Sequence, residues 1–197
     1  MKLWYSPRTR AFTALWMLEE SGLPYTLQRV RIDGPEPDPA LRAVNPMGKL
    51  PALEDGDAKF GETAAVLLYV ADKAGAAKNL APAADDPARG RFLQLLMFSA
   101  TCMEPAVMER MRGGAANAVQ MGWGDYARVE RVLLEAIVPD AWLTGADFTA
   151  ADLYIASTLS FLMGFNMMDK HPAFEAFTAR AQARDAYKRA AAVEAAG

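Results

Sequence analysis

The stretch from Asn45 to Asp72, NPMGKLPALEDGDAKFGETAAVLLYVAD, decides the fold of this chain of 197 residues. It begins with a turn, which is followed by a short apolar segment, a tight reverse turn and a second short segment. The reverse turn is Asp55-Gly56-Asp57, because Asp and Gly tolerate the backbone angles of a tight hairpin. An apolar run with helical spacing then starts after Thr63. We therefore expect two short antiparallel strands followed by a helix.

The two ends of the hairpin are candidate binding groups. Pro51 precedes the first strand and cannot donate to its ladder, so its presence needs a reason. If the Leu50-Pro51 bond is cis, the turn presents the Leu50 backbone outward, where an extended peptide can pair with it. At the helix start, unpaired N–H groups and the Thr63 hydroxyl can hold a carboxylate, and Glu62 can accept from an ammonium. The alternative is that Thr63 only caps its own helix.

The residues before this stretch predict a strand, a helix and a second strand. Met1–Tyr5 has the length and apolar character of a strand. From Thr9, apolar residues recur at helical spacing until Gly22, which is a suitable C-terminal stop. A second strand is expected over 25–32, and the sequence DGPEPDP over 33–39 predicts an exposed loop. This is the order of a thioredoxin-like fold, in which a right-handed crossover makes the first two strands parallel.

The residues after the stretch predict helices alone. The segment 73–87, KAGAAKNLAPAADDP, is rich in Ala, Pro and Asp and marks a linker. Beyond it, helical spacing recurs over Arg89–Arg112, Trp123–Ile137, Thr149–Met163 and from His171 to about Ala192. We therefore expect an α/β domain over 1–75, a linker over 76–87 and an all-α helical bundle over 88–197. The Ala-rich end, AAAVEAAG, is expected to fray.

Thr149 and Asp152 form the pattern of a capping box at the start of one of these helices. The Thr149 hydroxyl can accept from the N–H of Asp152, and the Asp152 carboxylate can reach back to the N–H of Thr149. This pair is expected to stabilise the fold and to take no part in chemistry.

Composition and charge place the chain among soluble globular proteins. The hydrophobic fraction is 52%, the charged fraction 23% and the formal charge −3, with no Lys/Arg cluster that indicates nucleic acid. Cys102 is the single cysteine and cannot form an intrachain disulfide, which favours a reducing compartment. No apolar run approaches the roughly 20 residues of a membrane span, and MKLWYS is too short to be a signal peptide. A cytoplasmic protein is expected, without a membrane partner.

Three motifs make the chain resemble the glutathione transferase family over nearly its whole length. NPMGKLPAL, which starts at Asn45, is similar to the turn in which the family carries a cis-proline. Gly61-Glu62-Thr63-Ala64 is similar to the family's Glu-Ser step, with Thr in place of Ser. LTGADFTAADLYIAS, from Leu143 to Ser157, is similar to the capping motif of the family's helical domain. The resemblance implies a thioredoxin-like, glutathione-binding domain followed by an all-helical domain.

The resemblance implies that the protein holds the thiol of glutathione as the thiolate. A free thiol has a pKa of about 8.5, and lowering it requires a donor and positive potential near the sulfur. Thr9-Arg10 aligns with Ser-Arg in several members of the family, so we expect Thr9 to supply the hydroxyl and Arg10 a cation. Ser6 is the second candidate and Tyr5 the third. The alternatives are that Thr9 is an ordinary helix N-cap and that Arg10 is a solvated charge.

Other expected glutathione contacts follow from the same resemblance. Leu50, next to Pro51, would bind through its backbone, and Lys49 through its charge on a carboxylate. Glu62 and Thr63 would hold the zwitterionic end of the ligand. Bacterial relatives of the beta class carry a cysteine where this chain has Arg10-Ala11, so a role in mixed disulfides is not implied here.

The implied activity is the conjugation of glutathione to small hydrophobic electrophiles, a detoxification reaction carried out by a homodimer. Eight of the eleven methionines fall between Met97 and Met168, and such flexible apolar side chains suit a site for variously shaped compounds. Met103, Met108 and Met111 have the spacing to line one helix face, although such a stripe is also typical of plain core. No cluster of metal ligands is present, so glutathione is the expected co-substrate and no metal is expected. The alternatives are a non-catalytic binding or regulatory protein of the same fold, or a glutathione-dependent peroxidase or isomerase.

Overall fold

The computed structural model describes residues 1–114 and 117–196, which form two compact units. The first unit consists of Met1–Leu80 together with residues 183–196, and the second of Ala81–Gln182. The sequence-based division assigned all of 88–197 to the helical domain. The difference is the C-terminal segment, which the contacts group with the N-terminal unit.

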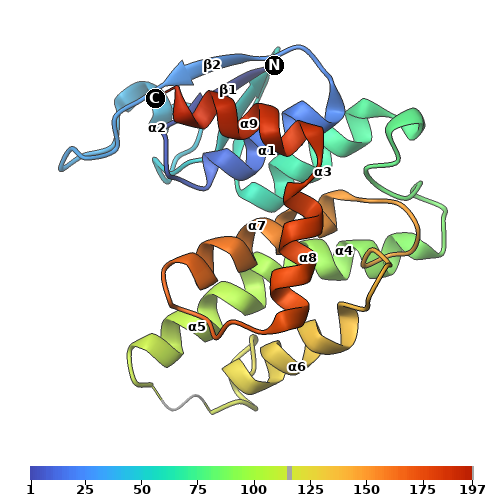
Figure 1. Ribbon diagram of the computed structural model, residues 1–197. Helices are drawn as coiled ribbons and strands as arrows, with labels where there is room; N and C mark the ends of the chain where they lie inside the picture. The colour runs from blue at the N-terminus through green and yellow to red at the C-terminus, as the bar shows by residue number, and fades with distance from the viewer. Residues whose placement is uncertain (115–116, 197) are drawn as a thin grey trace. The chain divides into compact units, whose positions relative to one another are not determined.

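The first unit is built on a four-stranded sheet of order β2-β1-β3-β4 (Figure 1). Its strands are β1 Lys2–Tyr5, β2 Thr26–Arg29, β3 Ala52–Asp55 and β4 Ala58–Gly61. β1 pairs with β2 in parallel, and the other two pairs are antiparallel. The expected hairpin is present: Gly56, at its turn, has a φ of 60°, in the left-handed region that Gly enters without a steric penalty.

Both faces of this sheet are covered. Side chains alternate along a strand, so Trp4 faces one side while Leu3 and Tyr5 face the other, and all three are buried. On the side of Trp4 lies the short helix α2, Pro39–Arg42, whose Leu41 packs with Trp4 in a small apolar cluster. The helices α1, Ala11–Ser21, and α3, Thr63–Ala74, pack against each other, and α1 also contacts β1. A short 3-10 turn, η1 Ala76–Lys78, follows α3.

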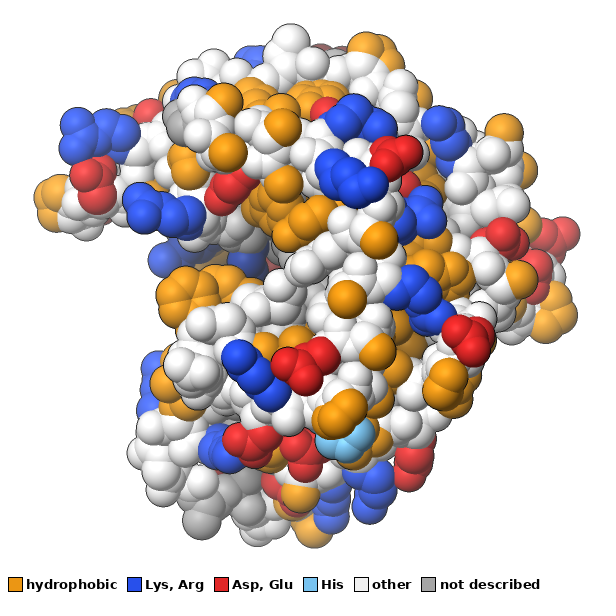
Figure 2. Space-filling view, in the orientation of Figure 1, with side chains coloured by type: hydrophobic (Ala, Val, Ile, Leu, Met, Phe, Trp, Pro, Cys, Tyr) orange, Lys and Arg blue, Asp and Glu red, His pale blue; other side chains and the backbone are white. Residues whose placement is uncertain are grey.

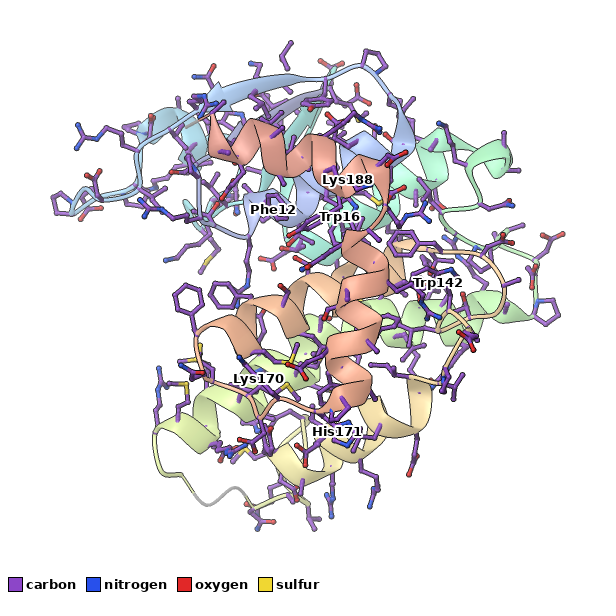
Figure 3. The ribbon with its side chains drawn as sticks, in the orientation of Figure 1. Phe12, Trp16, Trp142, Lys170, His171 and Lys188 are labelled. Atoms are coloured by element: carbon purple, nitrogen blue, oxygen red, sulfur yellow. The ribbon has the colours of Figure 1, made fainter. Side chains whose placement is uncertain are left out.

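The last helix, α9 Asp185–Ala195, packs along α1 (Figure 1). The Tyr187 ring makes T-shaped contacts with the rings of Phe12 and Trp16, at centroid distances of 5.6 and 4.9 Å, and Figure 3 shows both of these α1 side chains below α9. Burial raises the pKa of the Tyr187 hydroxyl above its ordinary value. The Ala-rich end, which was expected to fray, is helical to Ala195, and its Ala190 is buried, while Gly197 lies outside the described residues. On the face seen in Figure 2, basic and acidic side chains are interspersed over this part of the unit.

Helices joined by loops make up the second unit in its described residues, together with one isolated β-bridge between Trp142 and Gly145. Its elements are α4 Ala88–Phe98, the π-helical turn η2 Ser99–Met103, α5 Glu104–Met111, α6 Tyr126–Ala136, α7 Ala150–Gly164 and α8 Pro172–Gln182. The single helix expected over Arg89–Arg112 is interrupted by η2, because Pro105 has no N–H with which to continue the regular ladder. His171 precedes α8, where its Nδ1 accepts from the N–H of Ala173 at 3.2 Å (Figure 3). His171 thus serves the start of a helix, but the single helix expected from His171 to about Ala192 is divided into α8 and α9.

The capping box at the start of α7 is confirmed. The Asp152 carboxylate accepts from the Thr149 N–H at 2.9 Å, from the Thr149 hydroxyl at 2.7 Å and from the Leu143 N–H at 2.7 Å. Burial raises the pKa of Asp152, while these hydrogen bonds act in the opposite direction. The third bond ties the preceding loop to the helix and goes beyond what the sequence pattern predicts.

No helix within 1–114 and 117–196 combines the length and the apolar character that crossing a membrane requires.

Candidate functional site

The residues expected to bind glutathione come together at one edge of the sheet of the first unit. They belong to three segments, Ser6–Arg10, Lys49–Pro51 and Glu62-Thr63. Trp4 in β1 lies opposite Ala52 in β3, and Ala52 lies opposite Gly61 in β4. The three segments therefore adjoin the same ends of three neighbouring strands, β1, β3 and β4. Strands lie about 4.8 Å apart, so β1 and β4 are separated by about 10 Å, roughly the span of an extended tripeptide.

The bend before β3 offers its backbone. The Leu50-Pro51 peptide bond is cis. The Leu50 side chain packs against the apolar cluster that contains Trp4, so it points into the unit and not toward a ligand. Neither the N–H nor the C=O of Leu50 has a hydrogen-bond partner in the described part of the chain. Pro51 is buried and the Lys49 side chain is exposed.

Asn45 braces this bend, a role that the sequence interpretation missed. Its Nδ2 donates to the Lys49 carbonyl at 2.8 Å and its Oδ1 accepts from the Met47 N–H at 3.1 Å. Asn45 is also packed on the end of β4, because a Cβ on Gly61 would lie 2.3 Å from its Nδ2. Only glycine fits there. The signal was available, because an asparagine that opens a loop commonly bonds to its own backbone two residues on.

The start of α3 is the second binding group. Glu62 is its N-cap residue, with a φ of 67° and a ψ of 119°, and its side chain makes no capping hydrogen bond. Backbone angles of this kind are rare outside glycine and concentrate at functional sites. Thr63 is the first helical residue and is 6% exposed, and its hydroxyl has no partner among the residues that the structure describes. The alternative in which Thr63 caps its own helix is thus not what the structure shows. The hydroxyl and the first N–H groups of α3 are available to an anion.

The turn between β1 and α1 holds the candidates for the thiol. The Thr9 hydroxyl donates to the Ser6 carbonyl at 2.7 Å and accepts from the Ala11 N–H at 3.2 Å, so it is engaged within the turn. The Ser6 hydroxyl has no such partner in the described residues. Arg10 is the N-cap residue of α1 and makes no capping bond through its side chain. The catalytic roles of Thr9, Ser6 and Arg10 stay predictions.

A side chain from the far end of the chain also reaches this turn. The Tyr5 hydroxyl donates to Glu194 Oε2, and the Arg8 backbone N–H donates to Glu194 Oε1 at 2.6 Å. Arg8 has a φ of 59°, which is uncommon for a residue with a side chain. Sequence reasoning did not identify Glu194, because this contact joins positions 189 residues apart.

The methionines of the second unit fall into two groups. Met103 is buried, while Met108 and Met111 are 39% and 56% exposed, so the three do not line one common face. Phe161 and Phe165 of the same unit are exposed too, and their ring centroids are 4.8 Å apart. In the part of the chain that is described, no group of three or more His, Cys, Asp or Glu residues has the arrangement of a metal site.

Comparison with known proteins gives a consistent result. Residues 9–73 match the family model described as glutathione S-transferase, N-terminal domain. Glutathione S-transferase GstA of Escherichia coli O157:H7 is 30% identical over 81% of both chains. Glutathione S-transferase F14 of Arabidopsis thaliana is 27% identical over 76% of this chain, a match that spans 64% of the plant protein's length. A sphingomonad glutathione S-transferase, solved in complex with glutathione, is 25% identical with a TM-score of 0.80 and full coverage of both chains.

The chain therefore belongs to the glutathione S-transferase family. The expected fold, a thioredoxin-like α/β domain followed by helices, is confirmed by the sheet order and by these likenesses. The relatives support a function of the glutathione transferase type, and the binding of glutathione is the property that the solved complex supports most directly.

Proposed function

We propose that this protein is an enzyme that conjugates the glutathione thiolate to small hydrophobic electrophiles. The observation that carries the proposal is the convergence of three segments on one edge of the sheet, spaced to contact the length of a tripeptide. The likeness to a sphingomonad enzyme solved with glutathione supports the same ligand. Glutathione is then the co-substrate, and no metal is required.

Each end of the site has a separate task in this proposal. The Leu50 backbone next to Pro51 pairs with the main chain of the ligand, because its own hydrogen-bonding groups have no partner in the described residues. Thr63 and the start of α3 hold the α-carboxylate of the γ-glutamyl group, and Glu62 accepts from its ammonium. Lys49 is exposed and supplies charge for the other carboxylate of the ligand.

The turn between β1 and α1 then receives the sulfur. A hydroxyl that donates to the thiolate lowers the thiol pKa, as does the partial positive charge at a helix start. Thr9 and Ser6 carry the candidate hydroxyls, and Arg10 adds a cation. Catalysis consists of holding the thiolate and bringing the electrophile to it.

The test is an assay of purified protein with glutathione and a generic aromatic electrophile. Conjugate formation above the uncatalysed rate supports the proposal. Retention on immobilised glutathione without any turnover would instead indicate a non-catalytic binding or regulatory protein. Turnover of hydroperoxides with glutathione, in place of conjugation, would indicate the peroxidase alternative, and isomerisation of a substrate the isomerase.

We also propose that the protein is a cytoplasmic homodimer with a role in detoxification, as the family resemblance implies. Sedimentation at micromolar concentration tests the assembly, and a dimeric mass is expected. A monomer across the micromolar range would contradict it.

A further inference from the structure

The end of α9 places a carboxylate on the turn to which we assign the sulfur of glutathione. Glu194 Oε1 accepts from the Arg8 backbone N–H at 2.6 Å, and Glu194 Oε2 accepts from the Tyr5 hydroxyl. Tyr5 is the last residue of β1 and the third of the hydroxyl candidates, and Arg8 lies between the other two, Ser6 and Thr9. Two donors of this turn are thus already bonded to an anionic group that belongs to the chain itself.

Glu194 is not needed to dock α9 on the first unit. The Arg184 guanidinium makes two hydrogen bonds to the Glu20 carboxylate, of 2.7 and 2.8 Å. Arg189 donates to the Glu19 carboxylate at 2.7 Å and to the Glu19 carbonyl at 2.9 Å. Together with the aromatic contact of Tyr187, these bonds fix the first two turns of α9. The carboxylate of Glu194 can therefore leave its donors while the helix stays in place.

The position of Glu194 within α9 also argues against a purely structural role. It is next to the last residue of the helix, where the partial negative charge of the helix end disfavours a carboxylate. The last turn of a helix also opens more easily than its middle. A glutamate here does not stabilise α9 itself, so its contribution comes from the bonds to Tyr5 and Arg8.

We propose that Glu194 is an internal competitor for the glutathione thiolate, and that it occupies the donors of Tyr5 and Arg8 until the sulfur displaces it. This inference rests on the proposed function. A carboxylate and a thiolate repel each other and need the same donors, so only one of them is bound at a time. When the sulfur binds, the Glu194 side chain turns to solvent, and the Tyr5 hydroxyl and the Arg8 N–H donate to sulfur. No covalent bond changes in this exchange, and the closed form lowers the apparent affinity for the thiolate.

The test compares two ligands that differ at the sulfur. Calorimetric titrations use glutathione and S-methylglutathione, at a pH above the free thiol pKa of about 8.5, so that glutathione carries a thiolate and its methyl thioether does not. Glu194→Gln is expected to bind glutathione about tenfold more tightly than the wild type and S-methylglutathione with an affinity within about twofold. Glu194→Ala should behave in the same way. The matched control is Asp185→Asn, which removes the same charge from the opposite end of α9 and should change neither affinity.

A second substitution identifies the donors. In a Tyr5→Phe background, one of the two contested hydrogen bonds is gone, so the effect of Glu194→Gln on glutathione binding should shrink. Equal tightening of both ligands would show a general opening of the site and would overturn the inference. So would an unchanged or weakened affinity for glutathione in both Glu194 variants. If the wild type and all variants bind neither ligand, the proposed function fails and the inference fails with it; if the wild type binds both, only the inference is at stake.

Discussion

The two ends of the candidate glutathione site are built in different ways. The end made by the bend and the start of α3 lies within Asn45 to Thr63, and its supports are local: Asn45 bonds to Met47 and Lys49. The thiol end depends on residues that are remote in sequence. Its turn lies at 6–10, and the carboxylate bonded to its donors comes from position 194.

This difference separates recognition from reactivity. Local hydrogen bonds and a fixed backbone keep the first end in one shape, as required for a group that only orients a ligand. The thiol end is contacted by the last turn of a terminal helix, which can open at low cost. We therefore expect substitutions at the first end to have large effects on the free energy of unfolding and on the affinity for glutathione. Substitutions at the second end should have smaller effects, mainly on the pKa of the bound thiol.

Asn45→Ala is expected to have the largest effect. It removes two partly buried hydrogen bonds, to the Lys49 carbonyl and the Met47 N–H, and leaves a small cavity where the buried Asn45 side chain was, which should lower the free energy of unfolding by about 2–4 kcal/mol. Denaturant titration measures this change, and glutathione affinity should fall with it. Asn117→Ala is the control, because Asn117 makes the same bond to the N–H two residues on, at 3.2 Å, but is exposed. If both variants lost the same free energy of unfolding, the hydrogen bonds of Asn45 would contribute no more than those of an exposed asparagine.

Thr63→Val is next, and it tests ligand binding at the same end. The substitution keeps the size of the side chain and removes the hydroxyl that we propose to hold the ligand carboxylate. A hydrogen bond to a charged group contributes about 1.5–3 kcal/mol, so the Kd for glutathione should rise about 10- to 100-fold. Thr63→Ser retains the hydroxyl and should bind nearly as the wild type does. A valine variant that binds glutathione as tightly as the wild type would show that the Thr63 hydroxyl does not hold the ligand.

Arg184→Ala tests how firmly the terminal helix is docked. The Glu20 side chain is 5% exposed and would lose a bidentate partner, although the Trp16 Nε1–H at 3.1 Å would remain. We expect the free energy of unfolding to fall by about 1.5 kcal/mol, in the range of hydrogen bonds to charged groups. Arg131→Ala breaks the exposed pair with Glu135 and should leave stability unchanged. If the two variants had the same free energy of unfolding, the aromatic and alanine contacts of α9, and not the Arg184 ion pair, would hold the helix on the first unit.

Features that depend on neighbouring residues were predictable from the sequence. The hairpin at Gly56, the bend at Leu50-Pro51 and the capping box of Thr149 are each specified by a few adjacent residues, and each is present. The interruption of the long helix at η2 was missed, although Pro105 gives a local reason for it. The return of α9 to the first unit was not predictable, because the helical spacing of this Ala-rich end does not specify which surface buries it.

Thr9→Ala is expected to have the smallest effect and tests the thiol end directly. If the Thr9 hydroxyl turns from the Ser6 carbonyl to the bound sulfur, its loss removes a donor to the thiolate, so the pKa of bound glutathione should rise by about one unit, equivalent to about 1.4 kcal/mol. Thiolate absorbance measured against pH reports this value. Thr9→Ser keeps the hydroxyl and should titrate as the wild type does. The Ala11 N–H also loses its acceptor in Thr9→Ala, so a fall in stability of about 1 kcal/mol accompanies the change whether or not Thr9 contacts the sulfur. The titration is therefore the deciding measurement. An unchanged midpoint in Thr9→Ala would leave Thr9 with only its hydrogen bonds within the turn, and Ser6 would become the candidate donor to the thiolate, because its hydroxyl has no partner among the described residues.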